Sequence, residues 1–303
     1  MGLSVWHSSG PSVLVDVLAS KAAAKLAAAA EEAEESPPAD EPPPPPPPPI
    51  TDPIEAALAI LADDDVQAAV GGAAPSEDFA AVCEQLAITI PHPAVMKALS
   101  VSGVFSLRSW KADLPSLCAL LAVLSKHSGV TAARFWGCGL DASALELLAR
   151  GLPSSVDSLS LEADALTDHG SALGALVGVP TITSLSLRCA SLAPLPAALT
   201  DAVRSNATLT SLSLWGNPLG DAGALALFEV IRVHPTLLTL NLGRTHLTDV
   251  ATDGVLAMVS EEPAPATEGD AAADDAEVVA KEPVPPNRTL TALSLAHNAI
   301  GTR

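Results

Sequence analysis

An eleven-residue pattern that recurs along the chain constrains its fold more than any other sequence feature. In its clearest copy, Leu209 to Leu219, apolar residues stand at positions one, four, six and eleven and an asparagine at position nine. The spacing between the first four pairs of neighbouring copies is 26, 26, 27 and 28 residues, which indicates stacked structural repeats with one continuous core. Six copies begin at Val130, Val156, Ile182, Leu209, Leu237 and Leu290, and a degenerate seventh is expected near Met96, with Leu99 and Val101 as its strand residues.

Each copy has the residue pattern of a strand, a turn and a helix. Leu212 and Leu214 alternate with Ser211 and Ser213, so a short strand places its leucines on one face and its serines on the other. After the turn, apolar residues spaced three and four apart predict a helix with one buried face. These helices are expected near 113–126, 141–150, 168–177, 195–204, 221–233 and 248–259.

The residue at position nine of the pattern varies from copy to copy. An asparagine there bonds backbone groups that the turn would otherwise bury unpaired. Ala190 has no side chain able to do this, so the turn after Leu187 is expected to be looser. The six residues at this position are Cys138, Asp164, Ala190, Asn217, Thr245 and Asn298.

The amino-acid sequence of the repeats resembles that of the ribonuclease-inhibitor-like class of leucine-rich repeats. The segments Asn217-Pro218-Leu219-Gly220-Asp221-Ala222-Gly223-Ala224-Leu225 and Asn298-Ala299-Ile300-Gly301 are close to the consensus of that class. The resemblance covers residues 96–303 and implies an α/β solenoid of about six to seven repeats, with parallel concave strands and convex helices. It does not imply one function, because the class includes inhibitors, immune sensors, GTPase-activating proteins and structural subunits.

The first 95 residues lack the repeat, and we expect an arm followed by a cap. Residues 1–52 are rich in Ala, Glu and Pro, and alanine predicts a helix over 12–35, either a solvated or disordered arm or a docking helix for a partner. The eight prolines at 42–49 predict a stiff polyproline II segment, a spacer or a ligand of a proline-binding domain. Residues 53–95 are expected to form a helical N-terminal cap with helices around 54–61 and 79–88, and the aspartates at 63–65 are expected in a solvated loop between them.

Most of the net charge of −20 lies outside the repeats. Residues 1–90 hold fifteen acidic and two basic side chains, residues 261–282 hold eight acidic and one basic, and the remainder holds twelve of each. The repeats therefore lack a basic face, which argues against nucleic acid as a partner. The many charges and prolines predict a disordered acidic insertion at about 260–287 within the repeats.

The sequence contains no motif typical of an enzyme, a metal site or a cofactor site, so no catalytic residue, metal ligand or cofactor is predicted. No stretch is long and apolar enough to cross a bilayer, and membrane insertion is not expected. The four cysteines have no paired spacing and are predicted to be buried, reduced thiols, which favours the cytoplasm.

The residues that alternate with the strand leucines form two outward-facing columns that are candidates for partner binding. The first is Arg134, Ser160, Ser186, Ser213, Asn241 and Ser294, and the second is Trp136, Glu162, Arg188, Trp215, Gly243 and Ala296. Outward tryptophan and arginine are typical of binding hot spots, although a loop or a neighbouring repeat could instead cover each ring. Ribonuclease inhibitors grip their ligand with concave tryptophans, and the resemblance extends this to Trp136 and Trp215. The predicted partner-binding residues are Arg134, Trp136, Glu162, Arg188, Ser213, Trp215, Asn241 and Arg244.

These features predict a non-enzymatic scaffold that binds proteins, either through the concave strands or through the convex helices. The chain also resembles leucine-rich-repeat subunits of ciliary axonemes, which implies a structural or regulatory subunit of a larger assembly. The alternatives are a GTPase-activating protein similar to that of Ran, with Arg134 or Arg188 as its arginine, and a fragment of an immune or signalling sensor. The last repeat ends after its strand and turn, so we expect a partner or further chain to cover its apolar end.

Overall fold

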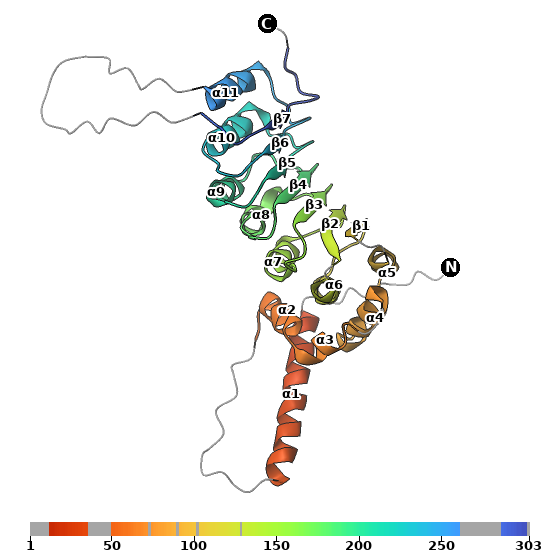
Figure 1. Cartoon of the computed structure of the whole chain (residues 1–303). Helices are drawn as coiled ribbons and strands as arrows, with labels where there is room; N and C mark the ends of the chain where they lie inside the picture. The colour runs from red at the N-terminus through yellow and green to blue at the C-terminus, as the bar shows by residue number, and fades with distance from the viewer. Residues whose placement is uncertain are drawn as a thin grey trace, which may run out of the picture. The chain divides into compact units, whose positions relative to one another are not determined.

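The computed structural model describes residues 12–35, 50–71, 74–88, 91–100, 103–127, 129–260 and 286–301. These residues form eleven α-helices, one short 3-10 helix and seven parallel strands, which make a single sheet in chain order from β1 to β7 (Figure 1). The predicted α/β solenoid is therefore confirmed. The proline run at 42–49 and most of the predicted acidic insertion lie outside the described residues.

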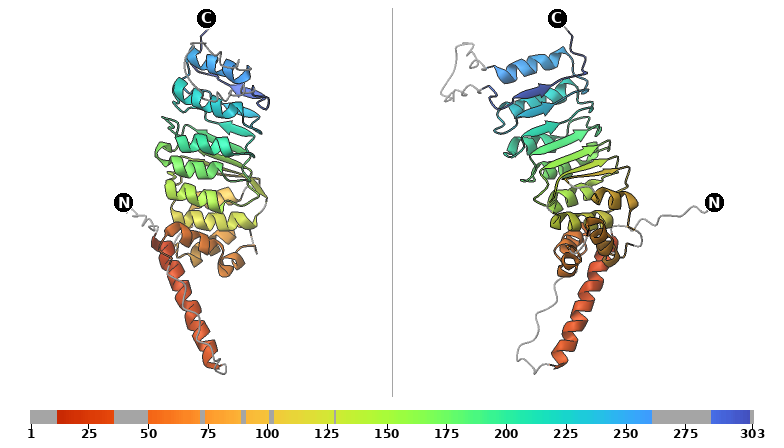
Figure 2. Two further views of the ribbon diagram at one scale, coloured as in Figure 1. Left: turned by 90° about the vertical axis from the view of Figure 1, so that its left-hand side faces the viewer. Right: turned by 45° about the vertical axis from the view of Figure 1, so that its right-hand side comes forward.

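The chain divides into two compact units, Met1–Asp164 and Ala165–Arg303, here called unit 1 and unit 2. Within each unit the helices that follow the strands cover one face of the sheet (Figure 2). The described elements of unit 1 are α1 (Ser12–Glu35), α2 (Pro53–Leu61), α3 (Asp64–Ala68), α4 (Pro75–Gln85), α5 (Pro93–Leu99), β1 (Gly103–Arg108), α6 (Leu114–Lys126), β2 (Val130–Trp136), α7 (Ala142–Gly151) and β3 (Ser158–Glu162). Those of unit 2 are η1 (Thr167–His169), α8 (Gly170–Val177), β4 (Ser184–Arg188), α9 (Ala197–Ser205), β5 (Ser211–Ser213), α10 (Gly220–Arg232), β6 (Thr239–Asn241), α11 (Asp249–Val259) and β7 (Ala292–Ser294).

The six helices predicted within the repeats are all present as α6 to α11. Two of them begin where an aspartate side chain accepts a hydrogen bond from the first turn, namely Asp113 for α6 and Asp141 for α7. The amide groups of the first helical turn have no hydrogen-bond partner within the helix. The two aspartate side chains accept from these amides and so fix where each helix starts.

The first strand lies later in the sequence than predicted. Leu99 was expected in a strand but is in helix α5, whose apolar residues have helical spacing after Pro93 in the first turn. Strand β1 instead buries Phe105 and Leu107, and Leu107 pairs in register with Phe135 of the next repeat. The prediction failed because helix α5 supplies an apolar run just before the true strand.

The N-terminal cap also differs from the prediction at the aspartates. Asp63 does not lie in a solvated loop, because it caps helix α3 by accepting hydrogen bonds from the amides of Asp65 and Val66. It also pairs with Lys21 of α1 at 2.9 Å. Burial opposes ionisation, but Lys21 and the two amides together hold the pKa of Asp63 below its usual value.

Helix α1 packs through its first turns against the cap, where Leu14 is completely buried. The ion pair of Lys21 with Asp63 fixes the same contact from the polar side. The predicted division of this region into an arm at 1–52 and a cap at 53–95 stays a prediction.

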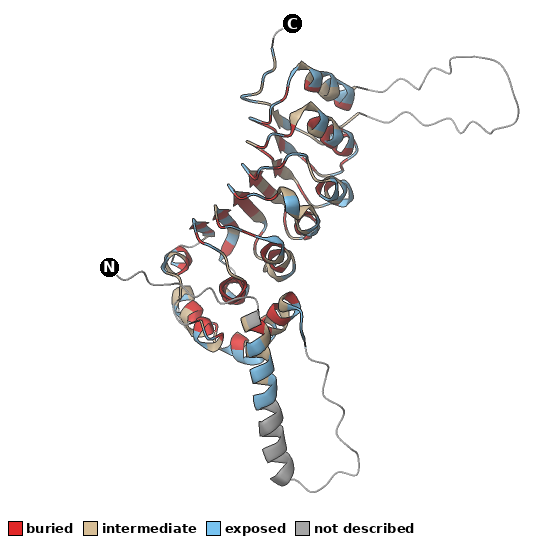
Figure 3. Cartoon of the chain, turned by 180° about the vertical axis from the view of Figure 1, so that it is seen from behind, coloured by how far each residue is buried: buried red, intermediate tan, exposed pale blue. Residues whose placement is uncertain are grey.

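The core of each unit lies between its strands and its helices (Figure 3). Leu240 and Leu242 of β6 and its turn are fully buried, whereas Leu293 and Leu295, which hold the same positions one repeat later, are partly exposed. The described part of unit 2 therefore presents apolar side chains at its last strand. Such an end is costly in water unless another group covers it.

The turn after Leu187 is held by the next repeat. Asn217 is completely buried, and its amide nitrogen donates to the carbonyls of Leu187 and Leu214 at 2.6 and 2.7 Å. Its amide oxygen accepts from the backbone N–H groups of Ala190 and Leu192 at 2.8 and 3.2 Å. One side chain thus bonds four buried backbone groups, two of which are N–H groups in the turn that contains Ala190.

Candidate functional site

The sheet face of unit 1 that the helices leave uncovered carries a stacked arginine and tryptophan. In the parallel register of β1 and β2, Arg108 lies directly opposite Trp136. The Arg108 guanidinium carbon is 4.5 Å from the centroid of the Trp136 ring, which is 45% exposed. This is the geometry of a cation–π contact, and it holds a large aromatic side chain at the surface.

Unit 2 repeats this arrangement on its own uncovered face and adds a second arginine. The guanidinium carbons of Arg188 and Arg244 lie 4.7 and 5.3 Å from the centroid of the Trp215 ring. The backbone carbonyl of Trp215 accepts a hydrogen bond from Cys189 N–H, as that of Trp136 accepts one from Ser109. We call the group Arg188, Trp215 and Arg244 the unit 2 stack.

A glycine makes room for the Trp215 ring. A Cβ atom added at Gly243 would lie 2.6 Å from Cδ1 and 2.9 Å from Nε1 of Trp215, closer than van der Waals contact allows. The ring therefore lies over Gly243 of the following repeat and is only partly exposed. The neighbouring repeat thus covers part of the Trp215 ring, which is one of the alternatives that the sequence allowed for an outward tryptophan.

The other predicted binding residues lie on the same faces as the tryptophans. In unit 1, Arg134 is exposed two residues before Trp136 on β2, and Glu162 is opposite Trp136 on β3 and accepts a hydrogen bond from the Ser160 hydroxyl at 2.8 Å. In unit 2, Ser213 and Asn241 are opposite each other on β5 and β6. Their part in binding stays a prediction.

Sequence reasoning missed Arg108. The sequence predicts the first strand at Leu99 and Val101, before the observed strand β1, so Arg108 lies outside the predicted strand. Leu107 stands one repeat period before Phe135, and this spacing would have placed Arg108 in the same column as Trp136 and Arg188.

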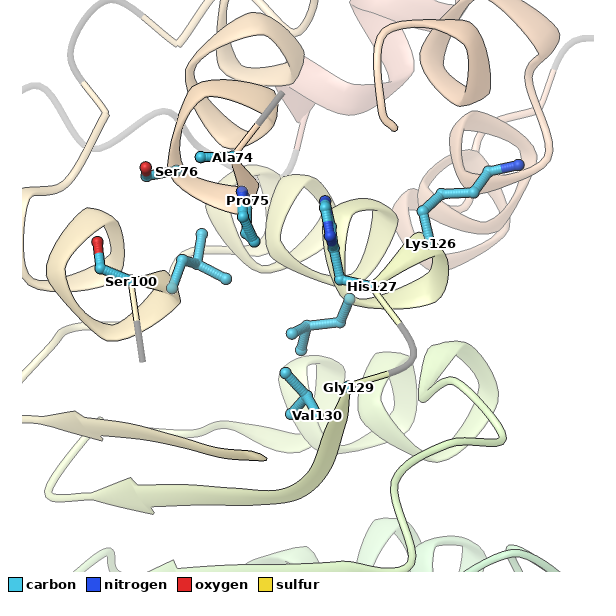
Figure 4. Close-up of a pocket in the computed structure, with 10 residues that line it drawn as sticks. Ala74, Pro75, Ser76, Ser100, Lys126, His127, Gly129 and Val130 are labelled. Atoms are coloured by element: carbon cyan, nitrogen blue, oxygen red, sulfur yellow. The ribbon is translucent and has the colours of Figure 1, made fainter. Parts of the chain in front are cut away.

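Unit 1 also has a groove of about 550 Å³ between the start of α4 and the end of α6 (Figure 4). At its edge, Nε2 of His127 lies 2.8 Å from a carboxylate oxygen of Asp78, which also accepts from Gly71 N–H at 2.8 Å. Asp78 is 3% exposed and is tied to both neighbours, so this pair links α4 to α6. Among the described residues, no group of three or more histidines, cysteines, aspartates or glutamates is placed to hold a metal ion.

The cysteines do not all behave as predicted. Burial raises the pKa of Cys83 and of Cys118 to about 12, and it also raises the pKa of Cys138. The prediction that all four are buried is wrong for Cys189, which is exposed at the end of β4. Its backbone occupies the left-handed region at φ 50° as the chain leaves the strand, and this turn brings the side chain to the surface.

Comparison with known proteins supports the repeat assignment at two places. A family model described as Leucine Rich repeat matches residues 205–228 and 287–303. The first segment contains Trp215 and Asn217, and the second contains Asn298. None of the helices in the described part of the chain has the length and apolarity needed to cross a membrane.

Two curated relatives share part of the sequence. Leucine-rich repeat-containing protein 73 from rat (Rattus norvegicus) and from human (Homo sapiens) are each 36% identical to this chain over 110 residues. The match covers 34% of this chain and 34% of each relative, so the chain spans about a third of the length of the relatives it matches. These matches support leucine-rich repeats as the structural unit.

Proposed function

We propose that this protein is a non-enzymatic scaffold that binds other proteins through the uncovered sheet faces of its repeats. The observation that carries the proposal is the pair of arginine-stacked tryptophans, one in each unit, at equivalent positions of the repeat. Aromatic and arginine side chains contribute most of the binding energy in many protein interfaces. The small side chain of Ser213, on strand β5 shortly before Trp215, would let a partner approach the backbone closely.

The experiment is affinity purification of the full chain under gentle conditions with mass spectrometry of the proteins recovered. It is run with the parent chain, with Trp136→Ala and Trp215→Ala together, and with Val233→Ala and Leu256→Ala as a control. Both control residues are exposed and apolar and lie on the helical side. Loss of a defined set of partners from the tryptophan variant alone supports the proposal. Retention of every partner by the tryptophan variant, or their loss from the helical-side variant, would contradict it.

The finer proposal is that the chain is a structural or regulatory subunit of a larger cytoplasmic assembly, such as a ciliary axoneme. The support for an assembly is the same set of outward tryptophan and arginine side chains that supports protein binding. Fractionation of ciliated cells tests the location, and absence of the protein from isolated axonemes would remove the ciliary version. A GTPase-activating role stays a prediction without a supporting contact.

A further inference from the structure

The unit 2 stack holds two arginines, and the outward positions of the described unit 2 strands hold no acidic side chain to pair with them. Strand residues of unit 2 alternate between the core and the uncovered face. The positions that face outward contain two arginines and no acidic residue among the described strands: Ser184, Ser186, Arg188, Ser211, Ser213, Trp215, Thr239, Asn241, Gly243, Arg244, Ala292, Ser294 and Ala296. In a chain of net charge −20, this is a local surface of the opposite sign.

The Trp215 ring limits where the two guanidinium groups can lie. A cation–π contact with the ring does not use the N–H donors of a guanidinium for a hydrogen bond. Among the described residues, neither Arg188 nor Arg244 has an ion pair, and Arg244 is exposed. The two guanidinium groups therefore offer N–H donors to an acceptor from outside.

We infer that the unit 2 stack is a binding site for an acidic segment of a partner protein, in which aspartate or glutamate carboxylates pair with Arg188 and Arg244. A planar carboxylate accepts two parallel hydrogen bonds from one guanidinium, which matches the donors that the stack leaves open. Because the guanidinium groups of both arginines lie close to the Trp215 ring, the ring acts as a positioning residue that holds the two cations in place. This inference rests on the proposed function and names the chemistry of the partner.

Unit 1 is a less suitable site for the same segment. Its stack has one arginine, Arg108, on the ring of Trp136. On the other side of that ring, the register places the acidic Glu162 opposite Trp136. An acidic segment would meet a like charge there, which lowers its affinity.

The test uses the full chain and a short fluorescein-labelled peptide in which glutamate alternates with serine, followed by fluorescence anisotropy at low salt. Two further peptides replace glutamate by glutamine or by phosphoserine. We expect the glutamate peptide to bind at least about tenfold more tightly than the glutamine peptide, with affinity falling as salt is raised. Equal binding of the glutamate and glutamine peptides would overturn the inference, and binding of the phosphoserine peptide alone would overturn it in favour of a phosphate site.

Variants then locate the site. Arg188→Gln with Arg244→Gln is expected to weaken the glutamate peptide by about tenfold or more. Arg204→Gln is the control for removing an arginine charge elsewhere in unit 2. Arg204 is exposed on helix α9, and its replacement should change the affinity less than about twofold. Unchanged binding by the double variant would show that the peptide binds elsewhere and overturn the inference.

Two variants that leave the net charge unchanged test the positioning role of Trp215. Gly243→Ala adds a Cβ atom in the space that the ring occupies, so it should displace the ring and weaken the peptide severalfold with no change in charge. Arg188→Lys with Arg244→Lys keeps the charge but loses the planar stack, and its affinity should fall between those of the parent and the glutamine variant. The melting temperature of each variant shows whether unit 2 is still folded. Parent-like affinity in folded Gly243→Ala protein would contradict the positioning role.

The two proposals can fail separately. If partners are lost from the tryptophan variant but the glutamate peptide does not bind the parent chain, the scaffold stands and the acidic ligand is wrong. If the peptide binds as expected but no protein depends on Trp136 and Trp215, the site is real and the scaffold proposal fails.

Discussion

The two units hold the same turn of the repeat with different side chains. In unit 2, Asn217 and Asn298 each donate to two carbonyls and accept from two backbone N–H groups. In unit 1, Asp164 accepts from Cys138 N–H and Gly139 N–H at 3.3 and 2.7 Å, but a carboxylate has no donor to return. The comparison teaches that this position needs both an acceptor and a donor, and that a carboxylate supplies only the acceptor.

Cys138 holds the same position one repeat earlier in unit 1 and offers only a thiol. Its sulfur lies 3.6 Å from the Trp136 carbonyl and 3.9 Å from the Leu107 carbonyl. These are long contacts of a weak donor, made to backbone groups of its own repeat and of the preceding one. We therefore expect the turns of unit 1 to contribute less stability than those of unit 2.

Asn217→Ala should have the largest effect of the changes that test this comparison. It leaves four buried backbone groups without their partner, and each unsatisfied group costs about 1–3 kcal/mol, so unit 2 should lose at least about 3 kcal/mol of unfolding free energy. Urea unfolding followed by circular dichroism measures the loss, and hydrogen exchange assigns it to unit 2. Asn241→Ala is the control, since that side chain accepts one bond from Gly243 N–H. Equal losses in both variants would show that the four buried hydrogen bonds of Asn217 contribute no more to the unfolding free energy than the single bond of Asn241.

Asp164→Asn should stabilise unit 1 by about 1 kcal/mol near neutral pH, because the new amide can donate to carbonyls as Asn217 does. Burial raises the pKa of Asp164, although amide donors oppose this. The folded state therefore holds the proton more tightly than the unfolded state, and stability falls as pH rises above 3.8 through the folded-state pKa. The variant should remove that fall.

Asp16→Asn, a change at an exposed aspartate of α1, is the control for Asp164→Asn. It should leave the unfolding free energy of unit 1 almost unchanged. A parent-like pH profile in the Asp164 variant would mean that this carboxyl group is not responsible for the fall.

A smaller effect is expected at a second position of the repeat, which lies before each strand. Unit 2 has Asn206 and Asn287 at this position in two repeats and His234 in the repeat between them. The Nδ1 atom of His234 accepts from Thr236 and Leu237 N–H, just as Asn206 and Asn287 accept before the neighbouring strands. Burial lowers the pKa of His234, opposed by the Val203 carbonyl, so the folded state binds the proton less tightly than the unfolded state. Stability should therefore decrease as pH falls below 6.5 toward the folded-state pKa.

His234→Asn should flatten this part of the pH profile of unit 2. The new amide can also donate to the helix of the preceding repeat, as Asn206 does to the Val177 carbonyl of α8 and Asn287 does to the Ile231 carbonyl of α10. Thermal unfolding between pH 7 and pH 5 measures the effect. His169→Asn, at a partly exposed histidine of the same unit, is the control and should keep the slope of the parent. An unchanged slope in the His234 variant would assign the pH dependence to another group.

The smallest effect concerns reactivity and leaves stability unchanged. Iodoacetamide at pH 8 should alkylate Cys189 in the native chain and leave Cys83, Cys118 and Cys138 unmodified, because burial keeps those three thiols protonated. Mass spectrometry of tryptic peptides reads the result. Rapid labelling of Cys138 would show that the turn of unit 1 opens, and it would sharpen the contrast with the turn at Asn217. The urea-unfolded chain, in which all four should react, is the control.

The sequence was sufficient wherever one side chain and its spacing decide the structure. The leucine spacing predicted helices α6 to α11 and the strands β2 to β7, because a repeat that cannot bury its own apolar face must stack on the next. The same alternation placed Trp136 and Trp215 on the outward side. It was insufficient for β1, because the apolar residues of α5 have a spacing that a short strand can also show.

Sequence alone therefore determined the repeat, its period and the outward position of the tryptophans, since these depend on local alternation along the chain. Only the tertiary structure decided which groups meet across repeats. It brought Arg108 to Trp136 and both Arg188 and Arg244 to Trp215, and it gave the Trp215 ring its place over Gly243. It also assigned the turn at Ala190 to the side chain of Asn217. The physical reason is that these contacts depend on the register between neighbouring strands, which the pattern within one repeat does not contain.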